Sequence, residues 1–159
     1  MIILKTNAFW LIVVLFFLPR LIYGQSKYVK TYKPVADSLS RLYGIPSVLI
    51  LGVAIVESGS GTSRNSKMLN NHFGISGRNN LLKKRGIKTR YKQYANARYS
   101  FAHFAKHLTK RKFYKRLKGN MNYILWVDAI SKDGYSEKPS IWKRRVLSTI
   151  KKNKLTSLQ

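Results

Sequence analysis

The thirteen residues from Pro46 to Ser58, PSVLILGVAIVES, limit the folds open to this chain more than any other feature. Proline suits the first turn of a helix. The residues that follow are apolar on nearly every side, and a helix of that kind is buried all round. We therefore expect this segment to form the centre of the domain. Gly59 and Gly61 should end the helix.

Helical spacing recurs on both sides of this segment. The apolar residues of a first helix, closed by Gly44, are Val35, Ala36, Leu39, Leu42 and Tyr43. Those of a later helix are Phe101, Phe104, Ala105 and Leu108, and two more helices are expected around 123–130 and 141–150. With no internal repeat or linker, the chain reads as one mainly helical unit.

The segment 79–94 has a different character. It is short and basic, it is centred on Gly86, and Ile87, Thr89, Tyr91 and Gln93 alternate with lysine and arginine. Alternation of this kind favours a β-hairpin. The fold class predicted from the sequence is therefore α+β, mainly helical, with a small β-hairpin lobe.

The N-terminus has the pattern of a secretory signal. Lys5 precedes an apolar stretch from Ala8 to Leu18, and the small residue Gly24 follows. That stretch is shorter than the roughly 20 residues that span a bilayer as a helix. We expect a signal peptide over 1–24 and a single domain over 25–159, exported to the periplasm or the extracellular space. Retention of the segment as an uncleaved anchor is the alternative.

Charge narrows the class of partner. The chain carries 31 basic and 5 acidic residues, a formal net charge of +26, and loss of the signal segment would leave +24. Such a charge implies a polyanionic partner. Export argues against nucleic acid and favours anionic polymers of the cell envelope, with peripheral contact to a membrane surface as a further expectation. Because the chain has no cysteine, it must hold together by packing.

Glu57 is the only carboxylate between Asp37 and Asp128. It is expected in the last turn of the buried helix, where burial and the free carbonyls of the helix end both disfavour the charged form. A carboxyl group that stays protonated near neutral pH can act as a general acid. The alternative is a buried structural brace that is hydrogen-bonded to the following loop.

Three ordered blocks around this residue resemble a known family. They are VESGSGTSRNSKMLNNHFGISG, YKQYANARYSFAHFAKHL and WVDAISKDGYSEKPSIWKRRVLSTI. Together they resemble glycoside hydrolase family 73, the endo-β-N-acetylglucosaminidases of bacterial peptidoglycan. The resemblance implies a lysozyme-like fold, no cofactor, and cleavage of the β-1,4 bond after N-acetylglucosamine. It also implies that Glu57 is the catalytic acid.

The same resemblance suggests further site residues. Tyr135 matches an active-site tyrosine that would orient the acetamido group of the substrate or the attacking water. Asn71, His72, Phe73 and Gly74 form the Asn-x-Phe-Gly block. The first three are expected at the substrate site, with Phe73 packed beneath the cleft and Asn71 either fixing the loop or bonding the sugar. Apart from the resemblance, the basic run 83–92 and its tyrosines Tyr91 and Tyr94 are expected to contact the glycan at a cationic lip of the cleft. A solvated hairpin is the alternative.

The chain also departs from the family. Members commonly carry a second carboxylate in the hairpin lobe, and GRNNLLKKRGIKTRYKQY contains none. We therefore expect the acetamido group of the substrate to supply the nucleophile, with Asp128, Asp133 or Glu137 as an alternative base for water. A lysozyme or lytic transglycosylase with one catalytic Glu, and a non-catalytic cationic wall-binding protein, are the competing functions.

His103 and His107 have the spacing of a zinc pair. The sequence between them lacks the Glu of a metalloprotease motif and offers no third ligand. We therefore expect no metal site.

Overall fold

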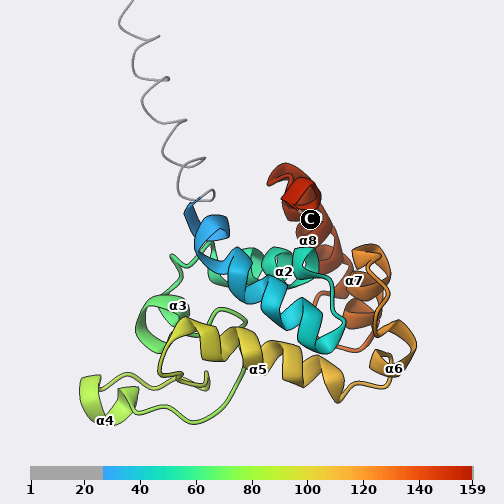
Figure 1. Ribbon diagram of the computed structural model, residues 1–159. Coiled ribbons are helices and arrows are strands. Elements are labelled where there is room, and N and C mark those ends of the chain that lie inside the picture. Colours follow the sequence, from blue (N-terminus) through green and yellow to red (C-terminus); the bar gives the residue numbers. More distant parts are fainter. Residues whose placement is uncertain (1–26, 159) are drawn as a thin grey trace, which may run out of the picture.

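The computed structural model describes residues 27–158, so the predicted signal peptide over 1–24 lies outside the described residues. The described part of the chain is helical (Figure 1). A first helix covers residues 27–43. The later elements are α2 (Ser47–Ser58), α3 (Arg64–Leu69), α4 (Leu81–Arg85), α5 (Ala97–Thr109), α6 (Tyr114–Leu117), α7 (Tyr123–Lys132), α8 (Pro139–Lys152) and the 3-10 helix η1 (Leu155–Leu158).

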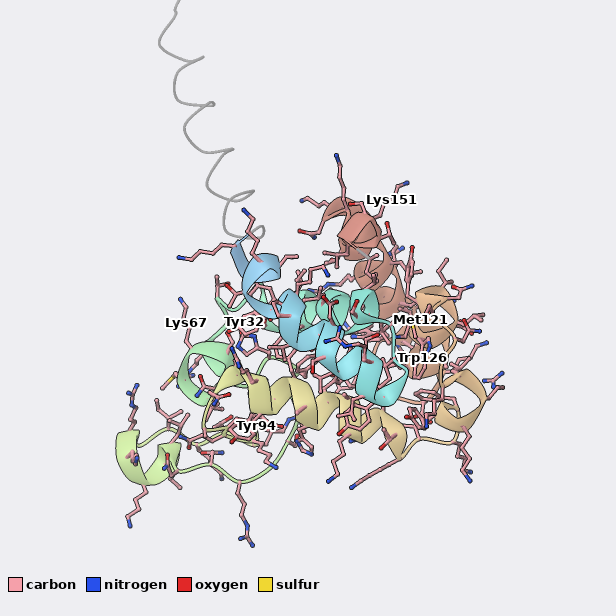
Figure 2. The ribbon with its side chains drawn as sticks, viewed as in Figure 1. Tyr32, Lys67, Tyr94, Met121, Trp126 and Lys151 are labelled. Carbon is pink, nitrogen blue, oxygen red and sulfur yellow. The ribbon has the colours of Figure 1, made fainter. Side chains whose placement is uncertain are left out.

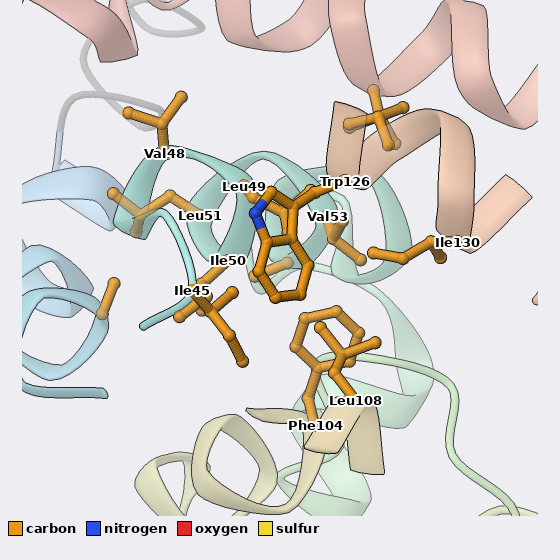
Figure 3. Close-up of a cluster of buried hydrophobic side chains, with 14 of the residues drawn as sticks. Ile45, Val48, Leu49, Ile50, Leu51, Val53, Phe104, Leu108, Trp126 and Ile130 are labelled. Carbon is orange, nitrogen blue, oxygen red and sulfur yellow. The ribbon is translucent and has the colours of Figure 1, made fainter. Parts of the chain in front are cut away.

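Helix α2 is the centre of the domain, as its sequence predicts. Every residue from Val48 to Ile55 is buried, and so is Ser58. Helices α5, α7 and α8 pack around it. Figure 3 shows the resulting core, in which side chains of α2 meet Phe104, Leu108, Trp126 and Ile130 from these neighbours. Gly59 ends α2 in the left-handed conformation, at φ 56°, which glycine adopts at little cost.

Helix α8 lies unusually close to α2 because of Gly52. A β-carbon placed on this glycine would lie 2.6 Å from Cγ1 of Ile150, which is closer than side-chain atoms approach in packed interiors. The absence of a side chain at one position therefore fixes the distance between two helices. That distance matters for the site below, since α8 carries residues that face the end of α2.

The first helix agrees with its predicted pattern except at one residue. Ala36 and Leu39 are buried against the core, and Gly44 follows the helix at φ +64°. Gly44 also accepts a hydrogen bond from the backbone N–H of Gly119 at 2.9 Å. Leu42 is 67% exposed. It shares the helical spacing of the buried residues but lies near the end of the helix, beyond the surface that the core covers.

The predicted β-hairpin over 79–94 is wrong. Residues 81–85, LLKKR, form the short helix α4, and Gly86 ends that helix at φ +67° instead of forming a hairpin turn. Good helix formers in this stretch outweigh the alternation that follows them. Within residues 27–158 the only β pairing is an isolated antiparallel bridge between Ser76 and Tyr91. The mainly helical character that the sequence predicted is confirmed, and the β-hairpin lobe that made the expected class α+β is absent from residues 27–158.

Side chains of Asn79 and Asn71 replace much of the missing ladder. Asn79 donates its amide N–H groups to the carbonyls of Thr89 and Tyr91, both at 2.9 Å. Backbone bonds from Gly77 to Arg90 and from Lys92 to Ile75 complete the pairing of the two extended segments. The two segments are thus held together without forming a sheet.

The surface is dominated by cations. Long side chains with terminal nitrogen atoms project outward from much of the molecule (Figure 2). Among residues 27–158, four ion pairs form, and they use only three carboxylates, those of Asp37, Asp128 and Asp133. Of the helices described, none is both long enough and apolar enough to cross a bilayer.

Candidate active site

Glu57 lines a cleft, which we consider the candidate active site. The residue occupies the last turn of α2 and is partly exposed, unlike the buried turn that precedes it. The cleft has a volume of about 620 Å³. Its walls come from the end of α2, the extended segments around 73–76 and 90–91, the end of α5, the loop 133–138 and one face of α8. Segments from widely separated parts of the sequence therefore surround one carboxyl group.

The two oxygen atoms of Glu57 have different surroundings. Oε1 accepts a hydrogen bond from the indole N–H of Trp142 on α8, with a donor–acceptor distance of 2.7 Å. Oε2 faces Gly74, since a β-carbon placed on that glycine would lie only 3.6 Å away. Because Oε1 is held by a donor, the carboxyl proton is expected on Oε2.

Burial raises the pKa of Glu57 above its ordinary value. The hydrogen bond from Trp142 and the positive charge of Arg145 act in the opposite direction and are weaker than burial. The free carbonyls at the end of α2 add to the effect of burial. This balance is the one that the sequence left open. It favours a protonated Glu57, which is the form that a general acid requires.

Tyr135 also lines the cleft, and its hydroxyl has a fixed partner. It donates a hydrogen bond to the backbone carbonyl of Phe73 at 2.8 Å, and its ring packs against Phe104 and Trp142. Burial, followed by the nearby Glu57, raises the pKa of Tyr135 well above its ordinary value. The hydroxyl proton of Tyr135 is thus used in the hydrogen bond to Phe73, and a substrate could interact only with the lone pairs of the hydroxyl oxygen.

The Asn-x-Phe-Gly block divides between the cleft and the protein interior. Phe73 lines the floor of the cleft and stacks on Phe104, with ring centroids 4.3 Å apart. Asn71 is 1% exposed, and its amide N–H groups donate hydrogen bonds to the carbonyls of Ile75 and Lys92, at 2.8 and 2.9 Å. Asn71 therefore fixes the loop that carries Gly74 and does not reach the cleft.

His72 lies behind the cleft and does not line it. Its Nδ1 is hydrogen-bonded to the hydroxyl of Tyr28 at 2.7 Å, and its ring packs among Tyr32 and Phe101. Burial lowers the pKa of His72 to about 4. The Tyr28 hydroxyl also contacts Ser58, the residue after Glu57, at 3.3 Å. Tyr28 on the first helix thus links His72 to the end of α2 through a buried polar cluster.

The two tyrosines of the basic segment are placed differently from each other. Tyr91 lines the cleft, and its ring carbon Cε1 would lie 3.9 Å from a β-carbon on Gly74. Tyr94 is buried, and its hydroxyl is hydrogen-bonded to Nδ1 of His103 at 2.6 Å. Figure 2 shows Tyr94 beside α5, among the packed residues of the lobe. The structure therefore brings Glu57, Tyr135, Phe73 and Tyr91 together and leaves Tyr94 outside the cleft.

The three C-terminal carboxylates that the sequence offers as a base are not equivalent. Asp128 lies outside the cleft, where hydrogen bonds from Lys132 and Lys143 lower its pKa to about 2. Asp133 lines the cleft and is paired with Arg111. Glu137 also lines the cleft, is exposed, and belongs to none of the four ion pairs of the described residues.

Sequence reasoning missed Trp142, Arg145 and Gly74. The first two are three residues apart on α8 and share a face, which their spacing indicates. No local signal shows that this face meets the end of α2, 85 residues earlier. Gly74 stands at φ +65°, and only its place in the family block hinted at a need for glycine.

The described residues contain no group of three or more His, Cys, Asp or Glu side chains that could hold a metal ion. His103 is hydrogen-bonded to Tyr94, whereas His107 lines the cleft, so the two histidines lie in different environments.

Comparison with known proteins decides the family. Residues 33–155 match the glucosaminidase model, described as mannosyl-glycoprotein endo-β-N-acetylglucosaminidase. The chain belongs to the glucosaminidase family. It is therefore a glycoside hydrolase, as the sequence blocks implied. A search of curated protein sequences finds no match.

Solved structures share the fold at low sequence identity. The catalytic domain of the autolysin Auto from Listeria monocytogenes superposes with a TM-score of 0.69 at 17% identity, covering 86% of this chain and 88% of that one. A glycoside hydrolase domain of FlgJ from Salmonella typhimurium gives 0.65 at 20% identity, covering 82% and 98%. A structure of a type VI secretion system effector–immunity complex from Pseudomonas protegens gives 0.60 at 20% identity, covering 84% and 97%. The mainly helical, lysozyme-like fold is thereby confirmed.

Proposed function

We propose that this glucosaminidase is an exported peptidoglycan hydrolase that cleaves the β-1,4 bond on the reducing side of N-acetylglucosamine. Glu57 carries the proposal, because it is a carboxyl group with a raised pKa at the end of a buried helix in a cleft. An autolysin among the structural neighbours and a net charge of +26 both suit an anionic wall polymer as substrate.

In the proposed reaction Glu57 acts first as the acid. Its Oε2 proton passes to the glycosidic oxygen as the bond from that oxygen to the anomeric carbon breaks. General acid catalysis of this kind contributes typically about 10²–10⁴-fold to the rate. Trp142 holds Oε1 during the transfer and stabilises the carboxylate that forms. The same carboxylate then takes a proton from the water that completes hydrolysis.

The nucleophile in this proposal is the acetamido oxygen of the substrate. It attacks the anomeric carbon from the face opposite the leaving oxygen and forms a cyclic oxazolinium ion, which water opens. The positive charge that develops on the acetamido nitrogen is stabilised by an acceptor. The oxygen of Tyr135 suits this role, since its proton is donated to the Phe73 carbonyl and its lone pairs remain.

Glu137 is the alternative base for an attacking water. It lines the cleft without an ion-pair partner among the described residues, whereas Asp133 is paired with Arg111. Glu137→Gln distinguishes the two routes. The substrate-assisted route predicts that this variant retains most of its activity, whereas a base at Glu137 predicts a loss comparable to that of Glu57→Gln.

The test of the reaction is mass spectrometry of products from purified peptidoglycan, with Glu57→Gln as the matched variant. Reducing-end N-acetylglucosamine from the native protein, and none from the variant, supports the proposal. Anhydro-N-acetylmuramic acid would assign the chain to the lytic transglycosylases. Wall binding without cleavage would mean that Glu57 is a structural brace in a non-catalytic binding protein.

Export is the second part of the proposal, and it rests on the apolar stretch from Ala8 to Leu18. N-terminal sequencing of exported protein should begin at or near Gln25. Full-length protein recovered from the cytoplasm would contradict it.

A further inference from the structure

The candidate cleft is positively charged at the place where a neutral sugar chain would lie. Four cations line it: Arg90, Arg111, Lys138 and Arg145. Of the three carboxylates there, Asp133 is already paired with Arg111, and the raised pKa of Glu57 favours its neutral form. Arg90, Lys138 and Arg145 therefore face a single unpaired carboxylate, that of Glu137.

Two of these cations, Arg145 and Arg90, line the cleft of the candidate acid from different elements. Arg145 extends from α8 one turn after Trp142, is exposed, and is near enough for its charge to act on Glu57. Arg90 lies in the extended segment of the lobe, with its guanidinium 5.5 Å from the centroid of the Tyr91 ring. A carbon of the Tyr91 ring and Glu57 Oε2 lie 3.9 and 3.6 Å from the β-carbon position of Gly74.

A neutral glycan gives guanidinium groups little to bind. A strand of N-acetyl sugars offers hydroxyl and amide groups, for which a neutral donor or acceptor is sufficient. Guanidinium groups match carboxylates, which they bind through two parallel hydrogen bonds. In peptidoglycan the carboxylates belong to the side chains on the muramic acid residues. In the high-mannose glycans that the family description suggests, there are none.

We infer that the cleft selects glycan strands that carry acidic peptide side chains, with Arg90 and Arg145 binding carboxylates beside the cleaved bond. This inference rests on the proposed function and names the substrate class of the same site. It also separates the cleft cations from the general charge of the surface, because it assigns selectivity to two residues out of the 31 that are basic.

Arg144 supplies a matched control. It is adjacent to Arg145 on α8, it is exposed, and it lines a separate groove with Leu147 and Lys151. Arg144→Gln therefore removes the same charge from the same helix without changing the cleft. If overall charge governs the choice of substrate, Arg144→Gln and Arg145→Gln will have equal effects.

The experiment compares two forms of one substrate. Soluble glycan strands with their peptides are used as purified, and a second portion has its carboxylates converted to amides with carbodiimide and ammonia. We expect the native protein to cleave the acidic form about tenfold faster in kcat/KM. Arg90→Gln and Arg145→Gln should each reduce this ratio several-fold, and Arg144→Gln should leave it unchanged.

The ratio between the two substrates is the informative quantity. Arg145→Gln also changes the acidity of Glu57, and that change affects both substrates equally because both use the same acid. Equal ratios in the native protein and both cleft variants, or a fall of the same size in Arg144→Gln, would overturn the inference.

Binding separates this inference from the proposed reaction. Affinity for both forms of the strand is measured in Glu57→Gln, in which cleavage does not deplete the ligand. A preference for the acidic form that needs Arg90 and Arg145 supports the inference even if the native protein cleaves neither form. No preference in binding or in cleavage overturns it while leaving the hydrolase intact.

Discussion

Replacement of Trp142 by Phe should raise the pKa of Glu57. The indole N–H of Trp142 donates to Oε1 at 2.7 Å, which favours the ionised carboxylate and lowers the pKa of Glu57. Without this bond, the increase in pKa that burial causes is opposed less strongly. Phenylalanine keeps an aromatic ring against Tyr135, with which Trp142 packs at 5.2 Å between ring centroids. The substitution therefore removes the hydrogen bond and preserves most of the packing.

The size of the shift follows from the difference between two hydrogen bonds. A bond to a charged group contributes about 1.5–3 kcal/mol, and a bond to a neutral group about 1 kcal/mol. Trp142 thus favours the charged form of Glu57 by roughly 1 kcal/mol, and one pKa unit corresponds to about 1.4 kcal/mol. We expect the pKa of Glu57 in Trp142→Phe to rise by about one unit.

Carboxyl-carbon NMR measures this pKa without substrate. The chain contains only two glutamates, Glu57 and Glu137, so ¹³C-labelled glutamate gives two titration curves. Glu137 is exposed and serves as the internal reference. If Glu57 is the general acid, the alkaline limb of the pH–activity profile should move upward by the same amount as the NMR curve.

Trp126→Phe is the control for the loss of a buried indole. Trp126 is also buried in the core, and its N–H donates to the carbonyl of Asn120 at 2.8 Å, away from the cleft. This variant should lose stability and leave the titration of Glu57 unchanged. An unchanged or lowered pKa of Glu57 in Trp142→Phe, or an equal rise in Trp126→Phe, would refute the reasoning.

Three further predictions concern stability. Burial raises the folded-state pKa of Glu57, so the stabilisation that this group contributes is complete below its unfolded pKa of 4.5 and is lost as the pH rises through the folded pKa. Glu57→Gln should therefore be more stable than the native protein at neutral pH. Urea unfolding should show this difference in the free energy of unfolding disappear by pH 4. The folded-state pKa of His72 is about 4, against an ordinary value of 6.5, so the stabilisation that neutral His72 contributes is present above pH 6.5 and is lost as the pH falls toward 4. Over that range the free energy of unfolding of His72→Asn should fall by about 2 kcal/mol less than that of the native protein. Gly52→Ala should lower the free energy of unfolding by about 1–3 kcal/mol because its methyl group would displace Ile150, and a melting temperature equal to that of the native protein would contradict the packing described here.

Local patterns predicted the framework of this domain because they reflect local causes. An apolar segment from Val48 to Ile55 has no polar face to present to water, so its burial follows from composition alone. Counting from Pro46 then places Glu57 in the last turn of the same helix. The resemblance added the family, which the family match confirms, and the catalytic role of Glu57 stays a prediction.

Long-range contacts were not predictable in this way. The alternation from Ile87 to Gln93 indicated a strand, but its partner segment at 75–78 is too short and irregular for more than one bridge. Side-chain amides of Asn71 and Asn79 hold that lobe instead. Asn71 shows why the site was only partly predicted. An amide that braces a loop and an amide that binds a sugar look the same in a sequence, because both need a donor and an acceptor.

If Glu57 is the general acid, a chain with 31 basic residues has to keep this one carboxyl group protonated, and the surroundings of Glu57 favour that form. A cation in direct contact with Glu57 would lower its pKa and weaken it as an acid. Among the described residues, none pairs with it, and its only side-chain donor is the neutral indole of Trp142. Arg145 acts on it only as an exposed charge, which solvent screens. Burial therefore has the largest effect on the pKa of Glu57, and the cleft cation Arg145 has a smaller effect in the opposite direction.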